Sequence, residues 1–114
     1  MSAITTHVLD TARGRPAAGV EIRLSRRQPD GSWFQLGTSR TDGDGRVADL
    51  LPSGEPIGPG TYRLRFELRE YFDSVSLESF YPFAEVAFEV GEPAAHYHVP
   101  LLVSPYGYCT YRGS

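Results

Sequence analysis

Three histidines, His7, His96 and His98, are the side chains of this sequence best suited to acid and base chemistry near neutral pH. His96 and His98 are two positions apart in a run that alternates polar and apolar residues, so they lie on one face of a predicted strand. A histidine in a strand is more often a hydrogen-bonded surface group than a catalytic one. The spacing therefore supplies candidates and leaves their role open.

Metal binding is one alternative for these histidines, since two imidazoles could bind zinc with His7 or Asp10 as a third ligand. The sequence lacks a His-Glu-x-x-His motif, and Cys109 is its single cysteine. The run Asp42-Gly43-Asp44-Gly45 suggests a calcium loop, but its glycine placement and the missing distal glutamate favour a tight turn. We predict no metal site and no cofactor.

Arg46 follows this predicted turn and is one of 11 basic residues, so by itself it is an ordinary exposed arginine. Next to a histidine it could hold substrate oxygens, because a guanidinium stays charged and presents a planar set of donors. Ser114 has no G-x-S-x-G motif around it, and Cys109 has no flanking signature of a catalytic thiol. The residue pattern alone indicates no covalent nucleophile.

Composition excludes several classes of protein. With 114 residues, 40% of them hydrophobic and 22% charged, we expect a single globular domain over 1–114. The formal charge of −3, with Arg26-Arg27 as the one adjacent basic pair, argues against nucleic-acid binding. The single cysteine rules out an internal disulfide, and neither an export signal nor a run of about 18 apolar residues is present. We expect a cytoplasmic protein without a membrane segment.

Short alternating runs between Gly, Pro and Asp clusters predict an all-β sandwich of two antiparallel sheets. The strands are predicted at 4–9, 19–26, 33–40, 46–50, 61–69, 85–90, 96–104 and 106–112. The stretch 13–16 is predicted as a loop. One short helix of two turns is predicted over 73–80, with Asp73 or Ser74 as its N-cap and Pro82 beyond its end.

Alternation within the predicted strand 96–104 separates a core face from an outer face. One side carries Tyr97, Val99, Leu101 and Val103, and the other carries His96, His98 and Pro100. The apolar set is expected to face the core. A polar face on so apolar a strand needs a partner or a ligand.

Two blocks of the sequence resemble the defining blocks of the transthyretin-like family: the opening ITTHVLDTARGRPAAGVEIRL and the ending HYHVPLLVSPYGYCTYRGS. The segments TDGDGRV, GTYRLRFEL and FYPFAEVAFEV occur between them in the family's order, so the resemblance covers nearly the whole chain. The final tetrapeptide YRGS marks the hydrolase branch. The hormone-carrying branch, transthyretin proper, lacks the paired histidines of HYH and this ending. A non-catalytic small-molecule carrier of transthyretin type is therefore the alternative.

This resemblance implies a prealbumin-like sandwich that hydrolyses 5-hydroxyisourate, the unstable product of urate oxidation, to 2-oxo-4-hydroxy-4-carboxy-5-ureidoimidazoline in purine catabolism. It implies catalytic roles for His7, Arg46, His98 and Ser114, and substrate contacts for His7, Arg46, Tyr111, Arg112, Gly113 and Ser114. Cys109 stands where the family usually has serine.

The implied reaction fits these residue types. Opening a ring by adding water to a carbonyl and expelling a ring nitrogen requires a base, an oxyanion stabiliser and an acid. Either His7 or His98 deprotonates water, while Arg46 stabilises the developing oxyanion and lowers the pKa of the histidines. The other histidine, with the hydroxyl or carboxylate of Ser114, orients the first or protonates the nitrogen. Which histidine is the base stays open.

A homotetramer, built as a dimer of dimers with active sites at the interfaces, is also expected. His7, His98, Cys109 and Tyr111 alternate with apolar neighbours, so another surface must cover them. The predicted strand 106–112 is a long edge that a second chain could pair with. The resemblance implies the same assembly.

Overall fold

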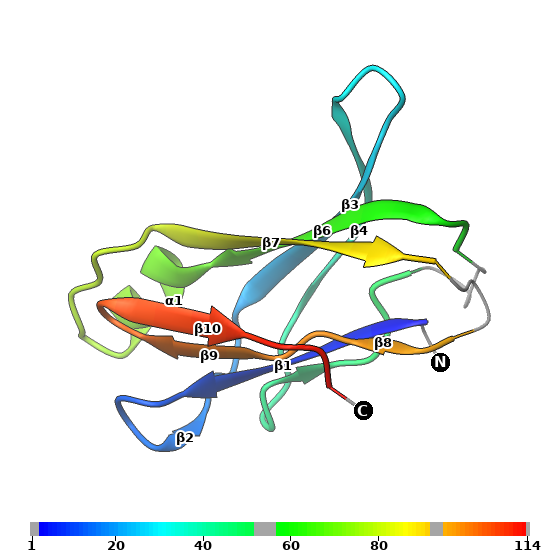
Figure 1. Ribbon diagram of the computed structural model, residues 1–114. Helices are drawn as coiled ribbons and strands as arrows, with labels where there is room; N and C mark the ends of the chain where they lie inside the picture. The colour runs from blue at the N-terminus through cyan, green and yellow to red at the C-terminus, as the bar shows by residue number, and fades with distance from the viewer. Residues whose placement is uncertain (1–2, 52–56, 92–94, 114) are drawn as a thin grey trace.

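The computed structural model describes residues 3–51, 57–91 and 95–113, which form two β-sheets packed face to face with one end covered by helix α1 (Figure 1). One sheet has the order β10-β9-β1-β2, with β5 and β8 also paired to β1, and the other has the order β4-β3-β6-β7. The elements are β1 (Ile4–Asp10), β2 (Arg15–Pro16), β3 (Glu21–Arg27), β4 (Trp33–Arg40), β5 (Arg46–Val47), β6 (Gly60–Glu67), α1 (Leu68–Ser74), β7 (Phe83–Val90), β8 (Tyr97–His98), β9 (Leu101–Ser104) and β10 (Gly107–Thr110). The predicted all-β sandwich is confirmed.

The core lies between the two sheets and follows the period of two in each strand. In β1, Ile4 and Val8 are fully buried while His7 between them is half-buried on the outer face. In β9, Leu101 and Val103 are likewise fully buried. The opposite sheet contributes Ile22, Leu24, Tyr62, Leu64, Phe66 and Ala84 to the same cluster. The predicted faces of the strands that carry histidines therefore hold, except that Pro100, predicted on the outer face with His96 and His98, is buried.

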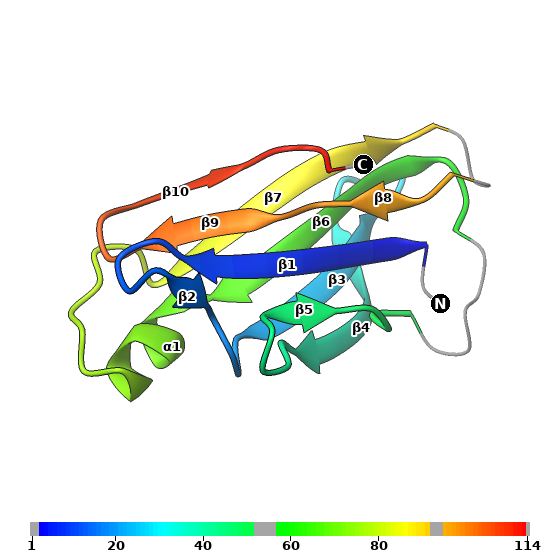
Figure 2. The same ribbon diagram turned by 90° about the horizontal axis from the view of Figure 1, so that it is seen from below.

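The sheet that contains β1 is mixed rather than purely antiparallel. β1 runs parallel to β8 and β9 on one edge and antiparallel to β2 and β5 on the other (Figure 2). Because β8 and β9 follow β7 of the other sheet, no tight hairpin forces them to run against β1. The predicted strand 96–104 is divided in two at Pro100, which has no N–H to donate to the ladder. The predicted loop 13–16 contains the short strand β2, and the predicted strand 46–50 shortens to β5.

The helix lies earlier than the predicted range 73–80. Leu68, Tyr71 and Phe72 recur at the spacing of one helical face and are all buried. The alternation of 61–69 concealed this start, because Leu68 also continues the apolar face of the strand. No helix in the described part of the chain is long and apolar enough to cross a bilayer.

The helix ends in a Schellman motif where its start had been predicted. The N–H of Leu77 donates to the carbonyl of Phe72 at 2.9 Å, and the N–H of Ser76 donates to the carbonyl of Asp73 at 3.1 Å. Ser76 has a φ of 61°, the left-handed conformation that this motif requires. Asp73 therefore lies in the last turn and is not an N-cap.

A buried carboxylate ties the helix to β1. Asp10 is 1% exposed and accepts hydrogen bonds from the backbone N–H groups of Ala12 and Arg13, each at 3.0 Å. The hydroxyl of Tyr71 donates to its other oxygen at 2.7 Å, and the pKa of Tyr71 is raised by its burial and by this bond. This network sets where the end of β1 lies relative to α1.

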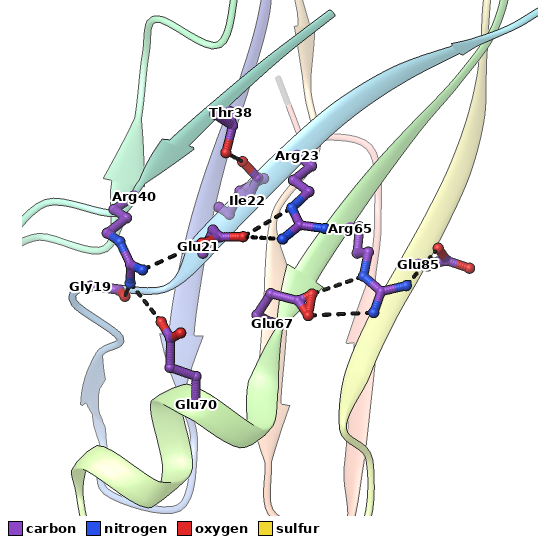
Figure 3. A network of polar contacts seen from close by, with 10 residues as sticks. All are labelled: Gly19, Glu21, Ile22, Arg23, Thr38, Arg40, Arg65, Glu67, Glu70 and Glu85. Carbon is purple, nitrogen blue, oxygen red and sulfur yellow. Dashed lines mark hydrogen bonds and ion pairs between the residues drawn. The ribbon is translucent and has the colours of Figure 1, made fainter. Parts of the chain in front are cut away.

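The outer face of the β4-β3-β6-β7 sheet carries a ladder of ion pairs (Figure 3). The pairs are Arg23 with Glu21 at 2.7 Å, Arg65 with Glu67 at 2.8 Å, Arg65 with Glu85 at 3.4 Å and Arg40 with Glu70 at 2.6 Å. Surface pairs of this kind add little stability each, and of these four only Arg65 with Glu85 joins neighbouring strands, β6 and β7, where opposite charges favour the observed register. The charges of this face are largely paired with one another.

We expect Ser76→Gly to stabilise the protein, because glycine adopts a φ of 61° without the cost that a side chain imposes. The expected gain is about 0.5–1 kcal/mol, or roughly 2–5 °C in Tm by calorimetry. Ser74→Gly, within the helix, is the matched control and should lower Tm. A fall in Tm for both variants would contradict the role given to Ser76.

Candidate active site

The turn before β5 places Arg46 beside β1. The carboxylate of Asp42 accepts the backbone N–H groups of Asp44 at 2.9 Å and Arg46 at 3.0 Å, which closes the turn as the sequence predicted. Gly45 has a φ of 76°, and a Cβ there would lie 2.4 Å from the carbonyl oxygen of Val8. The N–H of Val8 donates to the carbonyl of Gly45 at 2.7 Å. Only glycine at 45 allows the turn to lie so close to β1.

The pKa of Asp42 lies below its usual value, mainly because its carboxylate accepts the Arg46 N–H. The bond from Asp44 and the positive charge of Arg46 act in the same direction. Asp42 is therefore ionised at neutral pH and keeps the turn closed.

His7 lies directly opposite Arg46 in the antiparallel pairing of β1 and β5. Its Nε2 is 2.8 Å from the carbonyl oxygen of Asp44. A carbonyl oxygen can only accept, so Nε2 carries a proton and donates it. In a neutral His7 the lone pair is consequently on Nδ1, which fixes the nitrogen available for accepting a proton.

His98 reaches the same face from the other edge of β1, where it pairs with Thr5. Its Nδ1 is 2.8 Å from the Thr5 hydroxyl. The N–H of Gly113 donates to the His98 carbonyl at 2.8 Å, and a Cβ at position 113 would lie 2.5 Å from Cδ2 of the imidazole. The ring is thus held between a threonine hydroxyl and a residue that has no room for a side chain.

The pKa of His98 is lowered from its ordinary value, first by partial burial and then by the positive charge of Arg46. His7 and His96 lower it further. His98 is therefore neutral at pH 7 and able to accept a proton. The expectation that Arg46 depresses a histidine pKa holds for His98, although burial is the larger cause.

Arg46 and His98 meet in a pocket of about 290 Å³ on the outer face of the sheet. The pocket is lined by Thr5, Thr6, Arg46, Val47, Ala48, His96 and His98. Arg46 lies on β5 and His98 lies on β8, and these two strands pair with opposite edges of β1 (Figure 2). A permanent cation and a neutral imidazole in one pocket are suited to binding an electron-rich, oxygen-bearing substrate and moving a proton to or from it.

Only part of the C-terminal segment lies close to this pocket. The backbone of Gly113 pairs with His98, but the Arg112 guanidinium lies 4.8 Å from the ring centre of Tyr97. Tyr111 is 55% exposed and lines, with Arg112, a separate pocket of about 330 Å³ beside β7. Ser114 lies outside the described residues. Cys109 is exposed and pairs with Leu102 on β9.

Sequence reasoning missed Thr5 and the carbonyl of Asp44, the two groups that hold the imidazoles of His98 and His7. Thr5 shares the outer face with His7 by simple alternation, so its location could have been found. Its pairing with His98 could not, because that depends on the parallel register between β1 and β8.

The chain belongs to the HIUase/Transthyretin family, whose model matches residues 4–113. The resemblance seen in the sequence is confirmed at this level. A 5-hydroxyisourate hydrolase of Caulobacter vibrioides is 51% identical over 119 residues, which cover 100% of each chain.

Solved structures of similar fold include a 5-hydroxyisourate hydrolase and a transthyretin. The 5-hydroxyisourate hydrolase of Klebsiella pneumoniae is 38% identical, with a TM-score of 0.86 and 100% of both chains covered. Sea bream transthyretin in complex with thyroxine is 31% identical, with a TM-score of 0.89 and 97% of this chain and 94% of that chain covered. The fold is common to both, so function has to be argued from the residues of the pocket.

We expect Gly113→Ala to displace the His98 ring, because the new Cβ would collide with Cδ2. The imidazole signals of His98 in a ¹H–¹⁵N NMR spectrum should shift, and its hydrogen bond to Thr5 should weaken. Gly107→Ala is the matched control, since a Cβ there meets nothing nearer than the Ser104 hydroxyl at 3.8 Å. Unchanged His98 signals in Gly113→Ala would refute the close packing of the chain end on this ring.

Proposed function

We propose that this chain catalyses the hydrolysis of 5-hydroxyisourate to 2-oxo-4-hydroxy-4-carboxy-5-ureidoimidazoline, a step of urate degradation in purine catabolism. The observation that carries the proposal is the meeting of neutral His98 with Arg46 in one pocket, next to His7. The Caulobacter and Klebsiella relatives that bear the name of this activity support it. No cofactor takes part in the proposed chemistry.

In the proposed mechanism His98 is the general base. Its lowered pKa keeps it unprotonated, and because Thr5 occupies Nδ1, the reacting nitrogen is Nε2. Nε2 takes a proton from water while the oxygen of that water attacks the ring carbonyl. His7 accepts a hydrogen bond from the attacking water at Nδ1, since its Nε2 is engaged by Asp44.

Arg46 supplies the electrostatic part of this mechanism. As the carbonyl becomes tetrahedral its oxygen gains negative charge, which a fixed guanidinium stabilises more than it stabilises the neutral carbonyl. The ring then opens as the C–N bond breaks, and the leaving nitrogen receives a proton from Nε2 of His98. The family resemblance adds Tyr111, Arg112, Gly113 and Ser114 as further substrate contacts.

We propose further that residues 1–114 form a single domain, that the protein is cytoplasmic and that it assembles as a homotetramer, a dimer of dimers. The single cysteine supports the cytoplasmic location.

The assembly rests on a free strand edge, because β10 lies at the end of its sheet and can pair with a second copy. Because the pocket opens on the outer face of the sheet and Tyr111 and Arg112 lie away from it within one chain, we propose that assembly completes the site.

The catalytic proposal predicts that the protein accelerates the spectroscopic decay of freshly generated 5-hydroxyisourate. His7→Ala, Arg46→Ala and His98→Ala should each lower kcat/KM about a hundredfold or more, the size of effect found on losing a general base or an oxyanion donor. Arg23→Ala, on the outer face of the other sheet, is the control and should retain full activity. A carrier of transthyretin type would leave substrate decay at the uncatalysed rate.

The assembly proposal predicts a mass of four 12.6 kDa chains by light scattering at micromolar concentration. In the β9-β10 hairpin the N–H of Tyr108 points away from β9, toward the free edge of the sheet. Tyr108→Pro should therefore remove a backbone donor from this edge and lower the mass and the activity together. Tyr108→Phe keeps the backbone donor and is the control. A fully active monomer would contradict sites completed at interfaces.

A further inference from the structure

One hydroxyl group lies between two imidazoles at the edge of the pocket. The Oγ1 of Thr5 is 2.8 Å from Nδ1 of His98 and 2.9 Å from Nε2 of His96. His98 is half-buried, whereas His96 is exposed to solvent. The three side chains, all of which line the pocket, therefore form a continuous hydrogen-bonded chain from half-buried His98 to exposed His96.

Backbone hydrogen bonds hold this path in place. The N–H of Tyr97 donates to the carbonyl of Ala3 at 2.8 Å, and the N–H of Val99 donates to the carbonyl of Thr5 at 3.0 Å. These bonds set the parallel register in which Thr5 faces His98. The short distances thus follow from the sheet and not from a chance side-chain rotamer.

From this geometry we propose that Thr5 and His96 are positioning residues which relay a proton between the catalytic His98 and solvent. The proposal rests on the proposed function, in which His98 is the general base. It assigns a role to His96, which that mechanism does not use.

A threonine hydroxyl carries one proton, so Thr5 donates to one histidine and accepts from the other. When it donates to Nε2 of His96, it accepts from Nδ1 of His98. A neutral His98 then has its lone pair on Nε2 and is a base toward the pocket. In the opposite arrangement Thr5 donates to Nδ1 of His98, whose Nε2 then carries the proton and is an acid. The direction of one hydroxyl therefore decides whether His98 accepts or donates.

The relay conserves the number of protons and the total charge. When Nε2 of His98 takes a proton from the attacking water, the Nδ1 proton passes to Oγ1 of Thr5 and the former hydroxyl proton passes to Nε2 of His96. One N–H and one O–H bond break while one O–H and one N–H bond form, and the positive charge moves from His98 to His96. His96 then releases its Nδ1 proton to water. The reverse sequence restores the first state when Nε2 of His98 protonates the leaving nitrogen.

Electrostatics favour movement of the charge in this direction. Partial burial first, and then the positive charge of Arg46 on β5, lower the pKa of His98, and His7 on β1 and His96 act in the same direction. The carboxylate of Asp42 accepts the backbone N–H groups of the turn, and the charge of Arg46 lowers its pKa in addition to these bonds. A charge on exposed His96 is hydrated and lies farther along the path to solvent.

The test uses Thr5→Val, which keeps the shape and removes the hydroxyl, with Thr5→Ser to restore it. Thr38→Val is the matched control on the other sheet, where the Thr38 hydroxyl donates to the carbonyl of Ile22 at 3.2 Å. The readouts are kcat/KM for 5-hydroxyisourate against pH, Tm, and the tautomer of His98 from imidazole ¹⁵N chemical shifts.

In the wild type, kcat/KM should fall as the pH drops through the His98 pKa, because the base becomes protonated, and this limb should lie below the ordinary histidine value of about 6.5. Thr5→Val should lower kcat/KM about tenfold or more, shift this limb and give mixed His98 tautomers. Thr5→Ser should recover most of the rate. His96→Gln, which cannot titrate, should lower the rate less than His98→Ala but move the same limb.

Full activity with an unchanged pH profile and tautomer in Thr5→Val would overturn the relay and leave the proposed function standing. A rate loss matched by an equal loss in Thr38→Val, or accompanied by a large fall in Tm without any change in tautomer, would also overturn it. If the wild type does not accelerate substrate decay, the proposed function fails. The ¹⁵N spectra then still decide whether Thr5 controls the His98 tautomer.

Discussion

The register of β1 against its neighbours on both edges is the constraint on which the site depends. Thr5 pairs with His98 on one edge, and His7 pairs with Arg46 on the other. A slip of one residue would turn every side chain of β1 to the opposite face, burying His7 and exposing Val8. Hydrophobic burial thus specifies the face on which the chemistry occurs, although none of the buried residues takes part in it.

Buried polar groups add specificity that apolar residues do not supply. Thr6 is 1% exposed and donates to the carbonyl of Val99 at 2.6 Å, which joins β1 to the segment between β8 and β9. Asp10, the last residue of β1, accepts a hydrogen bond from the Tyr71 hydroxyl of α1. Each of these groups would be left unsatisfied by a shift in register, at a cost of about 1–3 kcal/mol. Two separate points of the strand are therefore fixed, one toward the segment between β8 and β9 and one toward α1.

The two sheets differ in how their outer faces use charge. On the β4-β3-β6-β7 sheet, Arg23 and Arg65 each form an ion pair with a carboxylate, so their charges are neutralised on this face (Figure 3). On the β1 sheet, Arg46 donates its backbone N–H to Asp42, and its side chain lines the pocket with His98. A guanidinium placed there adds to the effect of burial in lowering the His98 pKa and can donate hydrogen bonds to a substrate. The outer face of the β1 sheet thus carries the catalytic groups, while the charged groups on the outer face of the other sheet are paired with one another.

The sequence by itself determined the sandwich class, the faces of the strands and the family, because alternation with a period of two and the motifs at both ends are local properties of the chain. The same alternation misled at Leu68, which fits both a strand face and a helix face, so the helix was predicted too late in the sequence. Tertiary structure decided which groups meet. The pairing of Thr5 with His98, the bond from His7 to the Asp44 carbonyl and the contact of Gly113 with the His98 ring each join segments far apart in sequence. Such contacts depend on strand register and parallel pairing, which are set by the packing of the whole core and by backbone hydrogen bonds that no local pattern encodes.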